Sequence, residues 1–300
     1  MPSRKLIAGA TGFVGGRLAA ALAERGEPVR FLVRDPDRGR HLERDGAELH
    51  AGDVTDAASL EGVADGIGTA YYLVHAMAGG GGYAERERVG ARNFAQAAKE
   101  AGVERIVYLG GLGDETRSEH LRSRHETAEM LDAHGPPLTY FRAAMVVGGG
   151  SESYRTLRYL VGRLPVMIAP SWLRTDTQPI GIDAVVEYLR RAPDVPESAG
   201  REVQIGGPDV LAYGDMLDRM ALAMGIAPRR KIPVPLLSPS LSSLWLGLVT
   251  PVDTKVARPL VDGLRTATVV TDPSGAAPFG IEPASFDETL RRALEEERER

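Results

Sequence analysis

The stretch that decides the fold is residues 9–16, Gly9-Ala10-Thr11-Gly12-Phe13-Val14-Gly15-Gly16. A short apolar run at residues 5–9 precedes it, and residues 13–25 follow with the apolar spacing of a helix. Glycines at positions 9, 12 and 15 between a strand and a helix are typical of a dinucleotide-binding turn. Gly9 permits the tight turn, Gly12 lets a pyrophosphate approach the backbone, and Gly15 allows the helix to pack closely on the strand. The amides at the helix start supply the anion site.

The rest of the first half repeats this strand–helix alternation, which predicts an α/β fold with a doubly wound, Rossmann-type parallel sheet. Further strands are expected at residues 28–33, 47–50, 70–74, 105–109 and 138–144, and helices at 57–64, 85–101 and 121–133. After Gly150 the pattern gives helices at 151–162, 182–191 and 213–224, a strand at 202–205, and an extended, proline-punctuated stretch at 164–172. We predict an NAD(P)-binding domain over residues 1–150 and about 175–206. Residues 151–174 and 207–300 then form a smaller substrate or cap subdomain.

Composition excludes several classes of function. The chain has 300 residues, of which 43% are hydrophobic and 26% charged, as in ordinary globular proteins. The absence of cysteine excludes disulfides, cysteine nucleophiles and thiolate metal sites, and the six scattered histidines predict no metal site. A net charge of −5 argues against nucleic-acid binding. We predict a cytoplasmic protein, because the start shows no signal peptide and no segment is long and apolar enough to span a bilayer.

One late apolar segment, residues 236–252, is broken by prolines and serines and is too short to cross a membrane. We interpret it as a buried or interfacial helix, with contact to a membrane surface as the alternative.

The end of the second strand predicts which dinucleotide is preferred. NAD enzymes place an acidic residue there for the ribose 2′-hydroxyl. Here Arg34 stands at that point and Asp35 follows it. A guanidinium suits a 2′-phosphate in charge and geometry, so we predict NADP(H) as the preferred cofactor, with NAD(H) possible through Asp35. Arg17, Arg38 and Arg40 could add to this phosphate site.

Further cofactor contacts are expected at the ends of the next strands, where ligands of open α/β sheets lie. Asp53 could accept from the adenine amino group while Val54 packs on the ring; Thr55 or Asp56 could instead cap the next helix. From strands four and five we expect contacts from Leu73, Val74, His75, Gly110 and Gly111.

Several segments together resemble one known superfamily. They are GATGFVGG (9–16), LVRDP (32–36), GDVTD (52–56), YYLVHAM (71–77), YLGGLG (108–113), HLRSRHETAEML (120–131), FRAAMVVGGGS (141–151), QPIGIDAV (178–185) and IGGPDVLAYGDM (205–216). The chain resembles the extended and atypical short-chain dehydrogenase/reductases, in particular the NmrA-like NAD(P)H-binding branch. That branch includes the dinucleotide-binding accessory subunit of respiratory complex I. The resemblance implies the fold and the cofactor but does not specify a reaction.

The chain departs from the superfamily in its catalytic groups. Dehydrogenases of this kind use a tyrosine with a lysine four residues later and a serine or threonine at the end of strand five. None of the nine tyrosines has a lysine at that spacing. Alignment of the helix places Leu121 in the tyrosine position and His125 in the lysine position. The strand ends at Gly110, Gly111 and Leu112 and offers no hydroxyl group.

Two histidines remain as candidate catalytic groups. His125 could contact the nicotinamide ribose or donate a proton near neutral pH, or it could simply pack among Arg122, Arg124 and Glu129. His75 could lie beside the cofactor, or bond a backbone carbonyl at the strand end. Expected substrate contacts come from Met77, Leu112, Ala144 and Tyr154, with Trp172 and Gln178 as further pocket-lining candidates that core packing would explain equally well.

Three functions are compatible with these residues. The first is an NADPH-dependent oxidoreductase that transfers hydride to a small organic acceptor with a non-standard active site. The second is a non-catalytic NADP(H)-binding sensor or assembly protein, which the missing tyrosine–lysine pair favours. The third is an isomerase or lyase. The sequence predicts a small-molecule partner and leaves the oligomeric state open.

Overall fold

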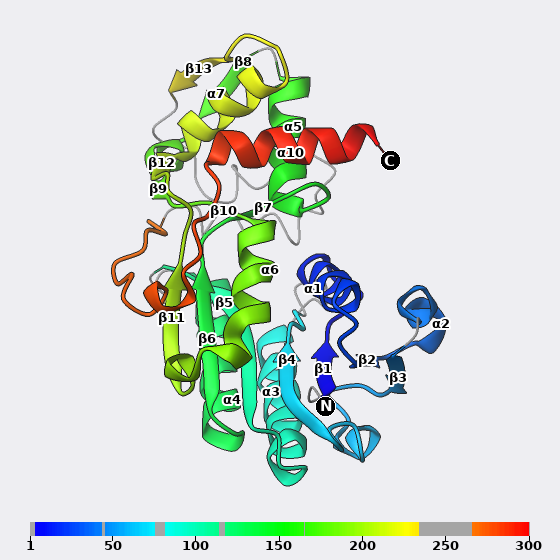
Figure 1. Ribbon diagram of the computed structural model, residues 1–300. Helices are drawn as coiled ribbons and strands as arrows, with labels where there is room; N and C mark the ends of the chain where they lie inside the picture. Colours follow the sequence, from blue (N-terminus) through cyan, green and yellow to red (C-terminus); the bar gives the residue numbers. More distant parts are fainter. Residues whose placement is uncertain are drawn as a thin grey trace.

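The computed structural model describes residues 4–43, 46–75, 82–113, 118–164, 166–233 and 266–299. Its centre is a seven-stranded sheet in the order β11-β6-β5-β4-β1-β2-β3 (Figure 1). The predicted α/β class with a Rossmann-type parallel sheet is confirmed.

The chain forms these elements in order. The first half holds β1 (Arg4–Ala8), α1 (Phe13–Glu24), β2 (Val29–Val33), α2 (Pro36–Gly39), η1 (Arg40–Leu42), β3 (Ala47–Ala51), η2 (Ala57–Leu60), β4 (Ile67–Tyr72), α3 (Tyr83–Glu100), β5 (Arg105–Gly111), α4 (Glu119–His134) and β6 (Leu138–Ala143). The second half holds β7 (Val146–Val147), α5 (Glu152–Arg163), β8 (Val166–Ala169), η4 (Ser171–Arg174), β9 (Asp176–Thr177), β10 (Ile180–Gly181), α6 (Ile182–Arg191), η5 (Ala192–Asp194), η6 (Pro196–Ser198), β11 (Arg201–Ile205), β12 (Leu211–Ala212), α7 (Tyr213–Ala223), β13 (Arg230–Pro233), η7 (Ala277–Phe279) and α10 (Phe286–Arg298).

All neighbouring strands of the central sheet run parallel. The chain moves from β1 outward to β2 and β3, then crosses back to β4, β5 and β6 on the other side. The order therefore reverses between β1 and β4, and ligands of open α/β sheets bind at such a point, beyond the carboxyl ends of the strands. The central strands are buried along their lengths, as expected for a sheet covered on both faces.

Two helical layers cover the sheet. On one face α1 and α6 bury a cluster that includes Leu18, Phe141 and Tyr188. On the other face α3 and α4 pack over a row of three tyrosines, Tyr72, Tyr108 and Tyr140, which the strand register aligns across β4, β5 and β6.

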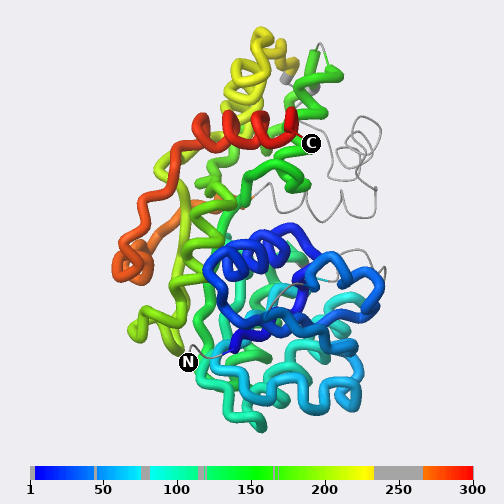
Figure 2. Tube along the Cα trace, turned by 45° about the vertical axis from the view of Figure 1, so that its right-hand side comes forward, coloured from blue at the N-terminus to red at the C-terminus, as the bar shows by residue number. Residues whose placement is uncertain are grey.

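The second part of the chain begins where β6 ends and builds its own core from α5, α7 and α10. Tyr154, Trp172, Met216 and Leu290 belong to this cluster. Figures 1 and 2 show these helices together at one end of the sheet. Within the span predicted for the smaller subdomain, however, Phe279 packs into the sheet core, with its ring centroid 5.4 Å from that of Phe141.

Three local expectations differ from the structure. The helix predicted at residues 57–64 is a single 3-10 turn, Ala57–Leu60, because Gly62 takes a left-handed φ of 69° and turns the chain. The fourth strand is Ile67–Tyr72 rather than residues 70–74. The stretch at 164–172 divides into β8 and η4, and β8 pairs with β13. The segment 236–252 lies outside the described residues.

Replacing Gly15 by alanine is expected to destabilise the protein without cofactor, because a Cβ at Gly15 would overlap the Gly9 carbonyl group. Overpacking of this kind costs about 1–3 kcal/mol. Gly16→Ala is the matched control, since its Cβ would stand 3.4 Å from the Ala10 carbonyl oxygen and alanine favours the helix. Urea unfolding should show a lower midpoint for Gly15→Ala alone; equal midpoints would contradict the packing assigned to Gly15.

Candidate functional site

The turn between β1 and α1 has the geometry of an anion cradle. Gly9 adopts a φ of 93°, where a Cβ would lie 2.5 Å from the Leu73 carbonyl oxygen, and the Gly12 amide donates to the Gly9 carbonyl at 3.0 Å. Helix α1 begins after Gly12 with no side-chain cap and no acidic residue in its first turn. Its first amides therefore face outward without a side-chain acceptor, as phosphate sites at helix starts require.

Gly12 is exposed, as is Thr11. A Cβ added at Gly12 would meet one neighbour, the Gly9 carbonyl oxygen at 3.3 Å, a tight contact within the turn itself. Phe13 and Val14 are partly buried, and Val14 packs against the sheet core. Because Gly12 is exposed and has no side chain, a ligand can approach its backbone closely. The turn therefore suits the pyrophosphate of a dinucleotide.

At the end of β2, Arg34 and Asp35 have different surroundings. Arg34 is exposed and makes no hydrogen bond or ion pair with any described residue. The Asp35 carboxylate caps α2 by accepting from the Asp37 amide at 3.0 Å. Of the two candidates for the ribose, Arg34 is therefore the side chain with unused donors.

Two of the three arginines expected beside Arg34 are engaged elsewhere. Arg17 pairs with Glu296 of α10 and donates to the Gly149 carbonyl at 3.1 Å, so it joins α1 to the C-terminal helix. Arg40 pairs with Asp37 at 2.7 Å. Arg38 is exposed.

The segment after β3 resolves the alternatives for its polar residues. Asp56 caps η2 by accepting from the Ala58 amide at 3.2 Å. The Asp53 carboxylate accepts from the amide and hydroxyl of Thr55 at 2.9 and 2.8 Å, which fixes its turn. Val54 is partly buried against the core beneath α3. Contact between these residues and an adenine remains a prediction.

The expected contacts on β4, β5 and β6 gather at the carboxyl ends of these strands. Leu73 is buried, its amide donates to the Ala8 carbonyl at 2.9 Å, and Val74 beside it is partly buried. Added Cβ atoms at Gly110 and Gly111 would lie 2.7 Å from the Tyr140 ring and 2.5 Å from Leu121. Glycine is therefore needed here for packing.

The expected substrate contacts have different surroundings. Leu112 is buried, and its amide donates to the Ala143 carbonyl at 2.8 Å. Ala144 is partly buried after β6. Met77 lies outside the described residues.

Three polar side chains meet at the carboxyl ends of β4 and β5. Arg124 of α4 donates from Nη1 to His75 Nε2 and from Nε to His120 Nε2, both at 3.0 Å, and its Nη1 approaches the Leu109 carbonyl at 3.5 Å. A guanidinium carries only donors, so both Nε2 atoms must act as acceptors. Each imidazole is thus neutral with its proton on Nδ1. The tautomers follow from Arg124 rather than from observed hydrogens.

The surroundings keep both imidazoles neutral at physiological pH. Desolvation by the surrounding protein, reinforced by the charge of Arg124, lowers the pKa of His120 to about 3. Desolvation and Arg124, with a smaller contribution from His120, also hold the pKa of His75 well below the ordinary histidine value. The His75 side chain nevertheless keeps an exposed surface. Neither histidine carries a proton to give up as imidazolium at pH 7.

His125 is not part of this hydrogen-bonded series, and its role beside a cofactor stays a prediction. Its ring lies 6.3 Å from that of Tyr140, which stacks at 5.4 Å on Tyr108, and Tyr108 in turn lies 6.4 Å from His75. Two tyrosine rings thus stand between the histidines. His125 Nε2 faces Glu129 at 3.7 Å. The α4 residue that meets His75 is Arg124.

Three residues predicted to line the pocket are held by other parts of the protein. Tyr154 is fully buried in the second core, and its hydroxyl donates to Glu297 at 2.9 Å, so it does not reach the strand ends. Trp172 is buried in the same cluster. Gln178 bonds the Gly207 carbonyl at 2.7 Å and the Val270 amide at 2.9 Å. Packing therefore accounts for these three side chains, and their contact with a substrate stays a prediction.

Sequence reasoning missed His120 and Arg124 as site residues. They lie four residues apart, the spacing that places two side chains on one face of a helix. The tyrosine and lysine of the superfamily have that spacing too, and this was the available signal. Leu121, one residue further, instead packs against Gly111 and Gly113.

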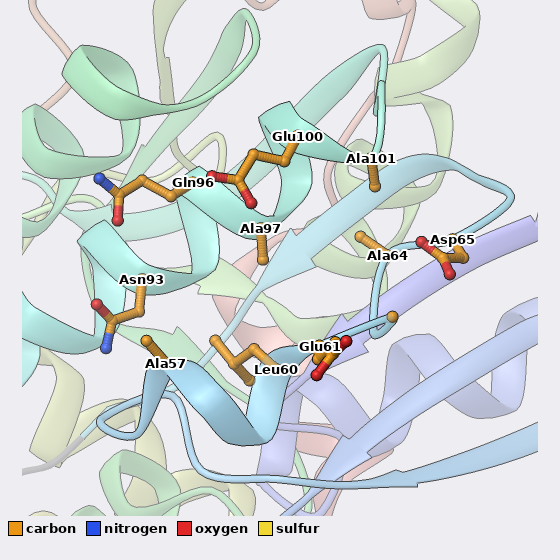
Figure 3. Close-up of a pocket in the computed structure, with 11 residues that line it drawn as sticks. Ala57, Leu60, Glu61, Ala64, Asp65, Asn93, Gln96, Ala97, Glu100 and Ala101 are labelled. Atoms are coloured by element: carbon orange, nitrogen blue, oxygen red, sulfur yellow. The ribbon is translucent and has the colours of Figure 1, made fainter.

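A cavity of about 360 Å³ lies away from these strand ends (Figure 3). It is bounded by η2, by the turn that follows η2, and by the second half of α3. Glu61, Asp65 and Glu100 line it, together with Asn93, which donates to the Val54 carbonyl at 2.9 Å. Its lining has three carboxylates and no cationic side chain. Such a lining repels phosphates, so this cavity is no site for a dinucleotide.

The described residues contain no group of three or more histidine, aspartate or glutamate side chains placed to bind a metal ion. None of the helices among them combines the length and the apolar character needed to cross a membrane.

Comparison with known proteins agrees with this geometry. Residues 9–146 match the NAD(P)H-binding family, so this part of the chain is an NAD(P)H-binding domain. The (4-alkanoyl-5-oxo-2,5-dihydrofuran-3-yl)methyl phosphate reductase of Streptomyces griseus is 26% identical over 229 residues, 73% of either chain. Subunit 9 of the mouse mitochondrial NADH dehydrogenase [ubiquinone] 1 alpha subcomplex is 24% identical over 67% of this chain and 55% of its own. Several other relatives are matched over only 34% to 38% of their length.

Among solved structures, the Escherichia coli NADPH-dependent quinone oxidoreductase QOR2, in complex with NADPH, superposes with a TM-score of 0.76. It is 20% identical, and the match covers 97% of this chain and 99% of that one. At this identity the likeness shows the shared fold. The predicted resemblance to the extended and NmrA-like reductases, with the complex I subunit as a distant relative, is confirmed.

Acid should destabilise the protein partly through the cluster. An unfolded chain protonates its histidines below about pH 6.5, whereas the folded protein keeps His75 and His120 neutral, so stability falls as pH drops. For His120, the more enclosed of the two, the contribution is at most about 1.4 kcal/mol per pH unit. We expect His120→Asn to lose less unfolding free energy between pH 7 and pH 5 than the parent. Urea titrations at both pH values measure this; His41→Gln, an exposed histidine outside the cluster, is the control, and parallel losses would contradict the account.

Proposed function

We propose that the protein is an NADPH-dependent oxidoreductase that reduces a small organic acceptor. The observation that carries this proposal is the pair of phosphate sites: the uncapped start of α1 and the exposed Arg34, whose neighbour Asp35 is used as a helix cap. The first suits any dinucleotide pyrophosphate. The second favours the cofactor with a 2′-phosphate, since Arg34 has five N–H donors and no partner among the described residues.

The strand order supports one orientation of a bound dinucleotide. With Arg34 at the 2′-phosphate, the adenosine half would lie over β2 and β3, and the other half would lie over β4 and β5, beyond the reversal of strand order between β1 and β4. The residues that would hold it are Gly9, Thr11, Gly12, Phe13, Val14, Gly15, Arg34, Asp53, Val54, Leu73, Val74, His75, Gly110 and Gly111. When bound, the nicotinamide supplies a hydride to the acceptor.

The relatives support this assignment. The Streptomyces relative is named as a reductase, and the structural neighbour with a TM-score of 0.76 holds NADPH and is named as a quinone oxidoreductase. We propose further that the smaller subdomain predicted over residues 151–174 and 207–300 encloses the substrate through its described helices α5, α7 and α10. The position of α5, α7 and α10 beyond the end of β6 supports this role (Figure 1).

A binding protein without turnover is the second candidate. Gly110 and Gly111 leave no hydroxyl group at the end of β5, and Leu121 fills the place beside them with an apolar side chain. NADPH oxidation against a panel of carbonyl, quinone and imine acceptors separates the two functions. Binding of NADPH with no oxidation on the whole panel would favour the second.

Arg34→Glu is expected to weaken NADPH binding by about 1.5–3 kcal/mol, the range for a hydrogen bond to a charged group, and to leave NADH binding unchanged or improved. Calorimetric titration with both cofactors measures the two affinities. Arg40→Gln is the control, because Arg40 is also exposed nearby but pairs with Asp37. Equal affinities of the unmodified protein for NADPH and NADH would show that Arg34 does not select the cofactor.

Gly12→Val should abolish binding of both cofactors while the fold persists, because Gly12 is exposed and its side is open for approach. Circular dichroism checks the fold, and the same titration checks binding. A Gly12→Val protein that still binds NADPH tightly would remove the turn from the site.

A further inference from the structure

We infer that Arg124, with His75 and His120, stabilises the negative charge that forms on the acceptor oxygen during reduction, and so selects conjugated carbonyl acceptors such as quinones and enones. This inference rests on the proposed oxidoreductase function. It concerns a cluster that neither the family match nor the relatives assign.

Position is the first argument. His75 lies two residues beyond Leu73, whose carbonyl group contacts Gly9 of the phosphate-binding turn. Arg124 and His120 reach the same point from α4, through hydrogen bonds of 3.0 Å along the series His75–Arg124–His120. The cluster therefore stands over β4 and β5, on the side of the switch point opposite to Arg34. That is the half of the site where the reacting end of the cofactor is expected.

Unused donors are the second argument. Arg124 uses Nε and Nη1 on the two histidines and on the Leu109 carbonyl, while its Nη2 has no hydrogen-bond partner among the described residues. Because Arg124 occupies both Nε2 atoms, His75 and His120 hold their protons on Nδ1. No carboxylate of the described chain pairs with Arg124. The arrangement thus offers one cation and further N–H donors to an oxygen that becomes negative.

The kind of acceptor follows from the groups that the described part of this cluster offers. Neutral imidazoles and a guanidinium stabilise negative charge but transfer no proton readily at neutral pH. The Tyr108 ring, 6.4 Å from that of His75, is buried, and its hydroxyl donates to the Arg124 backbone carbonyl at 3.3 Å. A simple ketone would become a strongly basic alkoxide that needs a proton during the reaction. A conjugated acceptor instead delocalises the charge as a phenolate or enolate.

The step balances with water as the proton source. Hydride adds to a carbon of the conjugated system, and the π electrons move onto the carbonyl oxygen, which becomes the oxyanion held by Arg124. Water then protonates the reduced acceptor, at oxygen for a quinone or at carbon for an enone. One hydride and one proton are consumed per acceptor.

Arg124→Gln is the main test, with Arg122→Gln as the matched control on the same helix. Arg122 is 55% exposed, and its side chain approaches Glu126 at 3.9 Å rather than the cluster. We expect Arg124→Gln to lower kcat for a quinone and for a cyclic enone by about 10²–10³-fold, the range for loss of an oxyanion donor. NADPH affinity should stay within about twofold, and Arg122→Gln should match the parent. Arg124→Lys keeps the positive charge but lacks the planar guanidinium with its several N–H donors. Its kcat should therefore lie between those of Arg124→Gln and the parent.

A second readout needs no turnover. 4-Nitrophenol mimics a delocalised oxyanion, and its absorbance reports its ionisation. The parent protein with bound NADP⁺ should bind the anion in preference to the neutral phenol and lower the apparent pKa of the bound probe. Arg124→Gln should lose that preference while its circular dichroism is unchanged.

The outcomes separate the two proposals. Full turnover in Arg124→Gln, faster reduction of simple ketones than of conjugated acceptors, or no preference for the nitrophenolate anion in the parent would each overturn the assignment of the cluster. A parent that binds NADPH and reduces no acceptor would overturn the proposed function instead. The nitrophenol titration then decides the role of Arg124 on its own.

Discussion

The whole site depends on how closely the start of α1 approaches the end of β1. Gly15 packs against the carbonyl group of Gly9, and Gly9 packs against the carbonyl group of Leu73 at the end of β4. Only backbone fits between these three points. This contact directs the first amides of α1 beyond the carboxyl ends of the strands. It also brings the residues that follow β4, including His75, next to the same turn. One steric constraint thus sets the distance between the phosphate site and the proposed reacting end.

Close packing also explains why the end of β5 carries no hydroxyl side chain. The rings of Tyr72, Tyr108 and Tyr140 fill the layer beneath α3 and α4, and Gly110 leaves room for Tyr140. Gly111 leaves room for Leu121 in the same way. A hydroxyl-bearing side chain at either glycine would collide with these neighbours. The apolar layer and a serine at this point exclude each other, so polar groups reach the site from α4 instead.

Sequence patterns were sufficient where a residue's role depends on its immediate neighbours. The glycine spacing predicted the turn, and the alternation of strands and helices predicted the sheet. The position of Arg34 at the end of β2 also followed from the chain alone. The cap formed by Asp35 and the turn at Gly62 are local as well, but they depend on backbone angles that spacing does not reveal.

The cluster on α4 was not predictable in this way. Neighbouring positions on a helix differ in direction by about 100°, so moving from residues 121 and 125 to 120 and 124 selects a different face. Which face meets His75 depends on the Ser118 cap and on the fit of Leu121 against Gly111 and Gly113. Those contacts join residues of separate elements, and hydrophobic periodicity carries no information about them.

The ion pair between Arg17 and Glu296 joins two residues that are 279 positions apart in the chain. Arg17 lies in the second turn of α1, whose first turn forms the anion cradle, and Glu296 lies near the end of α10. Detachment of α10 therefore removes a partner from the helix that would hold the cofactor. A ligand on that helix opposes such local opening. Amide hydrogen exchange in α10 thus becomes a distant reporter of cofactor occupancy.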